Sequence, residues 1–149
     1  MFRSRTWKEI GSPQGTRMVA AREFFRGVFE TALQQGDIVT AVVLPPSDPL
    51  RGAAYEKRSL VAGDFAIVSV AAIVGDAATI AIGGCGPKPL FAFGVAVSDD
   101  ALLTAGKRLA EESDPPSDQR ASAAYRRRVM PALIRRAVRA AQASIRAPQ

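Results

Sequence analysis

An almost entirely apolar run of strand length lies between Phe65 and Val74, and side chains in both alternating sets are apolar. Successive side chains of a strand point to opposite sides of a sheet, so the pattern predicts a strand covered on both faces. Gly75-Asp76 fits a two-residue hairpin turn, and Ala78 to Ile82 should return as the partner strand. We therefore expect a buried central hairpin in the middle of the chain.

Shorter patterns precede this hairpin. Ala21 to Gly27 has the periodicity of about two helical turns and ends in glycine. Ile38 to Leu44 is rich in β-branched residues and stops at Pro45-Pro46, which predicts a strand. Ala53 to Lys57 is expected to begin the next strand.

Two helices are expected after the hairpin. Ser98 can cap the first, with Asp99-Asp100 at the positive end of its dipole. Ser113 to Pro116 breaks it, and Ser117-Asp118 should cap the last helical segment, which runs to about Ile145. Pro131 is expected to be a break in this segment or the first-turn residue of a second piece. Apolar positions of this last segment recur at steps of three and four residues: Val129, Leu133, Ile134, Val138, Ala141 and Ile145.

The order of elements, strands first and helices afterwards, predicts an α+β fold. We expect a three- to four-stranded antiparallel sheet with about three helices packed on one face. At 149 residues the chain is long enough for one domain with its own core. Residues 1–14 are polar without a sustained period. Residues 1–17 are expected to be a leader or an inter-domain linker remnant, which leaves residues 18–149 as the domain.

The composition excludes several chemistries. The chain contains no histidine, which removes Ser-His-Asp and Cys-His catalysis and most transition-metal sites. It contains one cysteine, Cys85, which we interpret as a small, partly buried apolar side chain. A single cysteine without a secretion signal predicts a reducing, cytoplasmic location. No apolar stretch is long enough to cross a bilayer, so no integral membrane association is expected.

The net charge of +6 belongs to the C-terminal part of the chain. Eight arginines and no acids follow Asp118, whereas the rest of the chain has 12 basic and 14 acidic residues. The run could be a solvated helix face, a docking surface for an acidic partner, or a nucleic-acid or membrane contact. Nucleic-acid modules normally add exposed aromatic residues, and only Tyr125 lies nearby, so we expect no nucleic-acid partner.

A glycine-rich segment, Gly83 to Pro89, superficially resembles a phosphate-binding loop. Such loops place Ser or Thr directly after the lysine, where a helix begins. Here Lys88 is followed by Pro89, so a plain turn is the better interpretation.

Four stretches occur in one order along the chain: AAREFFRGVFETALQQGDIVTAVVLP, AAYEKRSLVAGDFAIVSVAA, IAIGGCGPKPL and PPSDQRASAAYRRRVMPALIRRAVRAA. Together they resemble the C-terminal domain of the FAD-binding medium subunit of the molybdenum hydroxylases, most closely the carbon-monoxide dehydrogenase medium subunit and its relatives in the xanthine dehydrogenase family. The resemblance runs from about Met18 to Arg146.

This resemblance implies an oxidoreductase component and not an enzyme on its own. In the family, an N-terminal domain binds most of the FAD and the C-terminal domain closes over the flavin ring. The implied partners are that FAD-binding domain, which this sequence lacks, an iron–sulfur subunit and a molybdopterin subunit. Electrons would pass from the iron–sulfur clusters through FAD to an acceptor. The alternative is a non-catalytic interaction or remnant domain that has lost FAD and whose basic C-terminal helix docks an acidic partner.

The resemblance also implies four flavin-contacting positions. Phe29 falls where the family often places an aromatic near the ring, and Val39 falls at an apolar contact. Lys57 falls at a basic position facing the ring system, and Asp64 at a polar position in the same region. From the residues alone, Phe29 could instead be a core aromatic, Lys57 a solvated lysine at a strand end, and Asp64 a turn acid.

Overall fold

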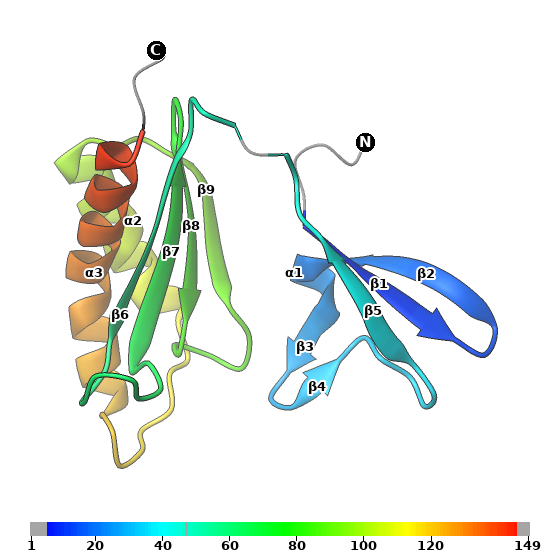
Figure 1. The fold of residues 1–149 in the computed structure, drawn as a ribbon. Coiled ribbons are helices and arrows are strands. Elements are labelled where there is room, and N and C mark those ends of the chain that lie inside the picture. The colour runs from blue at the N-terminus through cyan, green and yellow to red at the C-terminus, as the bar shows by residue number, and fades with distance from the viewer. Residues whose placement is uncertain (1–5, 47, 146–149) are drawn as a thin grey trace. The chain divides into compact units, whose positions relative to one another are not determined.

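The computed structural model describes residues 6–46 and 48–145 and divides the chain into two compact units (Figure 1). We call Met1–Asp48 the first unit and Pro49–Gln149 the second unit. Each is described by itself. The chain was expected to form one domain over residues 18–149, so the division after residue 48 is a new finding.

The first unit consists mainly of short strands: β1 (Trp7–Ser12), β2 (Gly15–Ala20), α1 (Ala21–Phe24), β3 (Phe25–Gly27), β4 (Glu30–Thr31) and β5 (Ile38–Val43). Strands β2, β1 and β5 form an antiparallel sheet in that order, and β3 pairs with β4. Its small core consists of Ile10, Phe24 and Ala32. The strand expected over Ile38 to Leu44 is confirmed as β5.

Residues 7–17, which were expected to belong to a leader or an inter-domain linker remnant, contain β1 and the first residues of β2. β1 pairs with β2 along its whole length, from Trp7 opposite Ala20 to Ser12 opposite Gly15. Of the six residues of β1 only Ile10 is buried, so the strand has no alternation of apolar and polar residues by which to recognise it. Residues 1–5 of the expected leader lie outside the described residues.

The second unit contains the central hairpin and both long helices: β6 (Gly52–Arg58), β7 (Val68–Val74), β8 (Ala78–Gly83), β9 (Leu90–Val95), α2 (Asp99–Glu112) and α3 (Ala123–Ala143). The strands form one antiparallel sheet in sequence order, with α2 and α3 on one face (Figure 1). This confirms the predicted α+β fold with its antiparallel sheet and three helices, although α1 belongs to the first unit.

The prediction of a strand covered on both faces is wrong. Strand β7 begins at Val68, and Val68, Val70, Ala72 and Val74 are buried toward the helices. Side chains of the other set are more exposed, with Ile73 at 47%. Apolar side chains of this set are exposed because they belong to a face of the sheet that the helices do not cover.

We call that face the open sheet face. Its exposed large side chains are Tyr55 on β6, Ile73 on β7, and Phe91 and Phe93 on β9. The two phenylalanine rings stack with their centroids 6.0 Å apart. The turn between β7 and β8 has three residues and not two, because Val74 pairs directly with Ala78.

Capping serines set the beginning of both helices. The Ser98 hydroxyl accepts a hydrogen bond from the Ala101 amide at 3.3 Å, which confirms the predicted start of α2. The second helix begins later than predicted, because its cap is Ser122 and not Ser117-Asp118. Asp118 instead binds the amides of the loop before the helix, Arg120 at 2.9 Å and Ala121 at 3.0 Å.

Helix α3 is held tightly to its neighbours at two glycines. A Cβ atom at Gly106 of α2 would lie 2.8 Å from Pro131 Cα, and one at Gly52 of β6 would lie 1.8 Å from the Ala141 carbonyl oxygen. Near Gly52, the Ser144 hydroxyl accepts from the Ala53 amide at 3.0 Å. These close approaches bring α3 against α2 and β6, and the buried sides of the four strands and both helices form one core.

Candidate functional site

A shallow concavity of about 370 Å³ lies beside the end of β6. It is lined by six residues from β6 and the loop that follows it: Tyr55, Lys57, Gly63, Asp64, Phe65 and Ala66. Lys57 and Asp64, two of the four predicted site residues, therefore lie together in the second unit.

Hydrogen bonds hold the loop part of this concavity in one shape. The Lys57 ammonium donates to the Asp64 carbonyl oxygen at 2.9 Å. The Asp64 carboxylate accepts from the Phe65 amide at 2.7 Å and lies 3.7 Å from the Arg120 guanidinium. Gly63 has φ of +86°, a conformation that suits glycine and lets the chain turn. Asp64 thus stabilises the turn, as the interpretation from its residue type alone suggested.

The concavity combines a cation with aromatic surface. Phe65 is 78% exposed and Tyr55 is 63% exposed, and the Arg120 guanidinium lies 5.5 Å from the Phe65 ring centroid. Lys57 keeps N–H donors beyond the one used on Asp64, because an ammonium carries three. Such a surface can lie against a flat, electron-rich ring and place positive charge beside it.

Phe29, the third predicted site residue, is the second residue of the two-residue turn between β3 and β4. Its φ is +56°, and it is the only non-glycine residue with positive φ in residues 6–46 and 48–145. Its side chain is fully exposed, at 105%. The alternative of a core aromatic is therefore wrong, since the ring touches no core and its backbone is strained.

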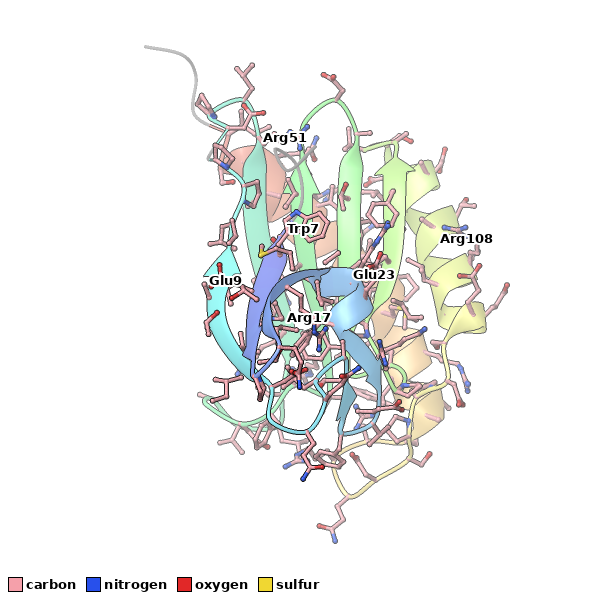
Figure 2. The ribbon with its side chains drawn as sticks, turned by 90° about the vertical axis from the view of Figure 1, so that its right-hand side faces the viewer. Trp7, Glu9, Arg17, Glu23, Arg51 and Arg108 are labelled. Carbon is pink, nitrogen blue, oxygen red and sulfur yellow. The ribbon has the colours of Figure 1, made fainter. Side chains whose placement is uncertain are left out.

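Arg17, labelled in Figure 2, forms a hydrogen bond to the segment that follows this turn. Its guanidinium donates to the Ala32 carbonyl oxygen at 3.0 Å and forms an ion pair with Asp37. The Gln34 amide, and then Arg17, lower the pKa of the Asp37 carboxyl below its usual value. Arg17 thus joins β2 to the segment between β4 and β5 within the first unit.

Val39, the fourth predicted site residue, lies on β5 opposite Ile10 of β1. It is partly buried and packs against the core of the first unit. The structure therefore gives Val39 a packing role, and its predicted contact with a flavin stays a prediction. Phe29 and Val39 belong to the first unit, and Lys57 and Asp64 to the second.

Sequence reasoning did not single out the buried arginine of α3. Arg126 is 3% exposed and bonds to the Ile67 and Gly84 carbonyl oxygens and to Asp118. Other arginines of the run also have partners: Arg136 binds Glu56, and Arg139 binds Asp99, both at 2.8 Å. The interpretation of the run as a purely solvated face is therefore too simple. Arg146 lies outside the described residues.

Other candidate chemistry is weak. Cys85 is buried, and burial raises the pKa of its thiol to about 11, so the reactive thiolate is scarce at neutral pH. Gly83 is the last residue of β8, and residues 84–89 form the expected plain loop. Within residues 6–46 and 48–145, no three His, Cys, Asp or Glu side chains are grouped so as to hold a metal ion. No helix in the described part of the chain is both long and apolar enough to span a membrane.

Comparison with known proteins places this fold among flavoprotein domains. A family model described as "CO dehydrogenase flavoprotein C-terminal domain" matches residues 53–141, which lie entirely within the second unit. The chain belongs to this family.

Two curated relatives are similar over most of the chain. The carbon monoxide dehydrogenase medium chain of Afipia carboxidovorans is 33% identical over 148 residues, covering 91% of this chain and 51% of the relative. The glyceraldehyde dehydrogenase medium chain of Sulfolobus acidocaldarius is 32% identical over 141 residues, covering 86% and 50%. The chain spans about half the length of the curated relatives it matches.

Solved structures show the same fold. A reconstituted CO dehydrogenase from Oligotropha carboxidovorans matches with a TM-score of 0.87 at 30% identity, covering 95% of this chain and 54% of that one. Quinoline 2-oxidoreductase from Pseudomonas putida 86 matches with a TM-score of 0.83 at 25% identity, covering 95% and 54%. The fold thus recurs in a dehydrogenase and in an oxidoreductase whose named substrates differ.

Proposed function

We propose that this chain caps the flavin in the FAD subunit of a molybdenum hydroxylase of the carbon-monoxide dehydrogenase type. The observation that carries the proposal is the concavity lined by Lys57 and Asp64, which we call the Lys57 concavity. It lies inside the region that matches the flavoprotein family. The partners would be an FAD-binding domain, an iron–sulfur subunit and a molybdopterin subunit. The single cysteine of this chain, Cys85, is buried and forms no disulfide, which suits a cytoplasmic location.

The residues present fit the ring of a flavin better than its phosphates. Lys57 lies among exposed aromatic side chains, and Phe29 presents a whole ring to its surroundings from a strained turn. Strained backbone conformations are frequent at ligand-contacting sites, where the strain is part of how the site works. The glycine-containing loop at residues 84–89 precedes β9 and not a helix, so it offers no helix N-terminus for a pyrophosphate.

The Lys57 ammonium would act electrostatically. A bound flavin supplies two-electron redox chemistry, and its reduced ring tends to carry negative charge at neutral pH. A unit charge pair about 4 Å apart interacts by about 4 kcal/mol at an effective dielectric of 20, before desolvation is subtracted. Lys57 would therefore stabilise the reduced form and raise the flavin midpoint potential. Asp64 would lie beside Lys57 in the same concavity. The flavin contacts that the resemblance gives Phe29 and Val39 of the first unit stay predictions, with Phe29 expected to shield the ring and limit which acceptor reaches it.

The test combines this chain with a separately produced FAD-binding half of a medium subunit. The expected result is a yellow complex that keeps flavin through desalting, whereas this chain alone keeps less than one FAD per chain. Lys57→Met should then lower the flavin midpoint potential, and Lys107→Met, which removes the same charge from an exposed position on α2, should leave it unchanged.

Two results would contradict the proposal. If no flavin is retained with the FAD-binding half present, the chain is a non-catalytic interaction domain, the alternative function. If both lysine variants shift the potential equally, Lys57 acts only as one of many distant charges and does not face the ring.

A further inference from the structure

Arg126 is the only buried charged residue in residues 6–46 and 48–145, and its contacts converge on the loop that forms the Lys57 concavity. We call residues 59–67, which connect β6 to β7, the Asp64 loop. In Figure 1 this loop lies at the same end of the second unit as the segment that precedes α3.

The first contact is with the C-terminal end of the Asp64 loop. Arg126 Nη1 donates to the Ile67 carbonyl oxygen and, at 3.0 Å, to that of Gly84. The Ile67 amide in turn donates to the Arg58 carbonyl oxygen at 2.7 Å, which joins this end of the loop to the end of β6. One guanidinium nitrogen thus joins the last residue of the Asp64 loop, Ile67, to Gly84, the first residue of the loop between β8 and β9.

The second contact reaches the tip of the loop through two intermediates. Arg126 Nη2 donates to the Asp118 carboxylate at 2.8 Å, and Asp118 accepts from the Arg120 and Ala121 amides. The Arg120 guanidinium then lies 3.7 Å from the Asp64 carboxylate and over the Phe65 ring. The Ala121 amide is also the main cause that lowers the pKa of the Asp118 carboxyl, so this carboxylate stays charged at neutral pH.

Stability alone does not account for a buried arginine here. The Arg126 Nε–H is buried without a hydrogen-bond partner among the described residues, and an unpaired buried donor is costly. Replacing buried ionic groups with well-packed apolar side chains is often neutral or stabilising. What an apolar side chain cannot do is bind two carbonyl oxygens and a carboxylate from three separate segments.

We infer that Arg126 is a positioning residue for the Lys57 concavity. Through Ile67 at one end of the Asp64 loop and through Asp118 and Arg120 at its tip, it holds the loop so that Lys57 reaches the Asp64 carbonyl oxygen. The SD-x-R-x-S-A-x-Y-R stretch, Ser117 to Arg126, is the sequence that builds this connection. That the positioned loop faces a flavin rests on the proposed function, whereas the positioning itself does not.

Hydrogen–deuterium exchange of the full chain, without flavin, tests the inference. Arg126→Gln should speed amide exchange in the Asp64 loop by at least about tenfold, because hydrogen bonds to charged groups are stronger than neutral ones and their loss makes local opening of the loop more frequent. Exchange in the paired centres of β7 and β8 should change much less. Arg127→Gln is the matched control, since it removes the same charge from the next residue of α3, whose guanidinium binds Ser113 and not the loop.

Two further variants separate positioning from folding. Arg126→Lys keeps the charge and one donor group, so it should recover part of the protection of the Asp64 loop. Asp118→Asn leaves Arg126 in place and breaks only the path to the loop tip, so it should speed exchange at Asp64 and Phe65 more than at Ile67. If Arg126→Gln does not fold, Asp118→Asn alone still tests whether the path from Arg126 to the loop tip protects the loop.

The inference is overturned if Arg126→Gln speeds exchange equally in the loop and in the strands, because Arg126 would then only stabilise the fold. It is also overturned if Asp118→Asn leaves exchange at the loop tip unchanged. Neither readout contains a flavin, so a failure of the proposed function would leave this result standing, and the reverse also holds.

Discussion

Phe29 combines two features that folding normally avoids, a positive φ and a fully exposed aromatic ring. A left-handed conformation costs an L residue about 1–2 kcal/mol, and an exposed ring recovers none of that cost through burial. Glycine adopts this conformation freely. The identity of the residue therefore reflects something other than the stability of the first unit.

Phe29→Gly should raise the free energy of unfolding by about 1 kcal/mol, because it relieves the strain and removes no buried contact. Phe24→Ala, at a side chain that is 6% exposed, should lower it by about 3–5 kcal/mol. Chemical denaturation followed by fluorescence or circular dichroism measures both changes. A loss of stability in Phe29→Gly would mean that the ring packs against something in solution.

Cys85 should react slowly with thiol reagents in the folded chain. Burial raises the pKa of its thiol to about 11, whereas an unfolded cysteine titrates near 8.5. The thiolate fraction at pH 8 is therefore lower in the folded state by roughly two-hundredfold. Labelling with a chromogenic disulfide at pH 8, with and without urea, measures the two rates. Equal rates would show that the thiol is accessible.

At this scale the local residue pattern predicted little of the geometry. That Lys57 and Asp64 lie together came from the family resemblance, since no local pattern links a strand-end lysine to a carbonyl oxygen seven residues later. The backbone strain at Phe29 could not be read from residue type, because glycine is the residue that would have signalled it.

Among the elements, α2 and α3 depend on one close approach. Gly106 lies where α2 meets Pro131 of α3, and a side chain there would meet backbone and not a flexible group. Pro131 lies inside α3, which continues through it from Ala123 to Ala143. Helix packing here thus depends on a glycine in one helix and a proline in the other.

Gly106→Ala should lower the free energy of unfolding by about 1–3 kcal/mol, the usual cost of overpacking a tight contact. Intrinsic helix propensity alone predicts the opposite sign, a gain of about 1 kcal/mol. Thr104→Ala, at an exposed position of the same helix, is the control and should change stability by about half a kcal/mol or less. Thermal unfolding of the three chains decides the sign. Stabilisation by Gly106→Ala would show that the helices separate at little cost.

Elements with strong signals were predicted well. The Ser98 cap, the apolar stripe of α3 and β5 all follow from local chemistry. β1 was missed because a strand with one buried side chain has no periodicity. For β7, apolar character on both sides was taken as burial on both sides, but small and apolar residues also occur on a face that stays open.

For the whole molecule, the second unit contains a complete core of its own. All residues of the larger hydrophobic cluster lie between Ala54 and Ala141, on the strands and helices of this unit and the segments between them. The fold class and family were predictable from order and motifs. The division of the chain was not, because length alone favours one domain and short strands give little evidence of a separate core.

Residues 49–149 expressed alone should fold cooperatively, with a circular dichroism spectrum of mixed helix and strand and a single thermal transition. Leu133→Ala in this shorter chain should lower the free energy of unfolding by about 2–5 kcal/mol, because that side chain is 6% exposed within the core. Arg108→Ala, at an exposed side chain of α2, should change it by about half a kcal/mol or less. A broad transition would show that the second unit is not independent.

The bonds between Ser144 and Ala53 join residues 91 positions apart, the first strand of the second unit to the end of its last helix. A ribosome makes about 5–20 residues per second, so on the order of 5 to 20 seconds separate the synthesis of these two residues. Throughout that interval β6 lacks the end of the helix that packs against it. The second unit therefore completes its folding only after α3 has been made, and losing the last turn of α3 would leave β6 without its final contact.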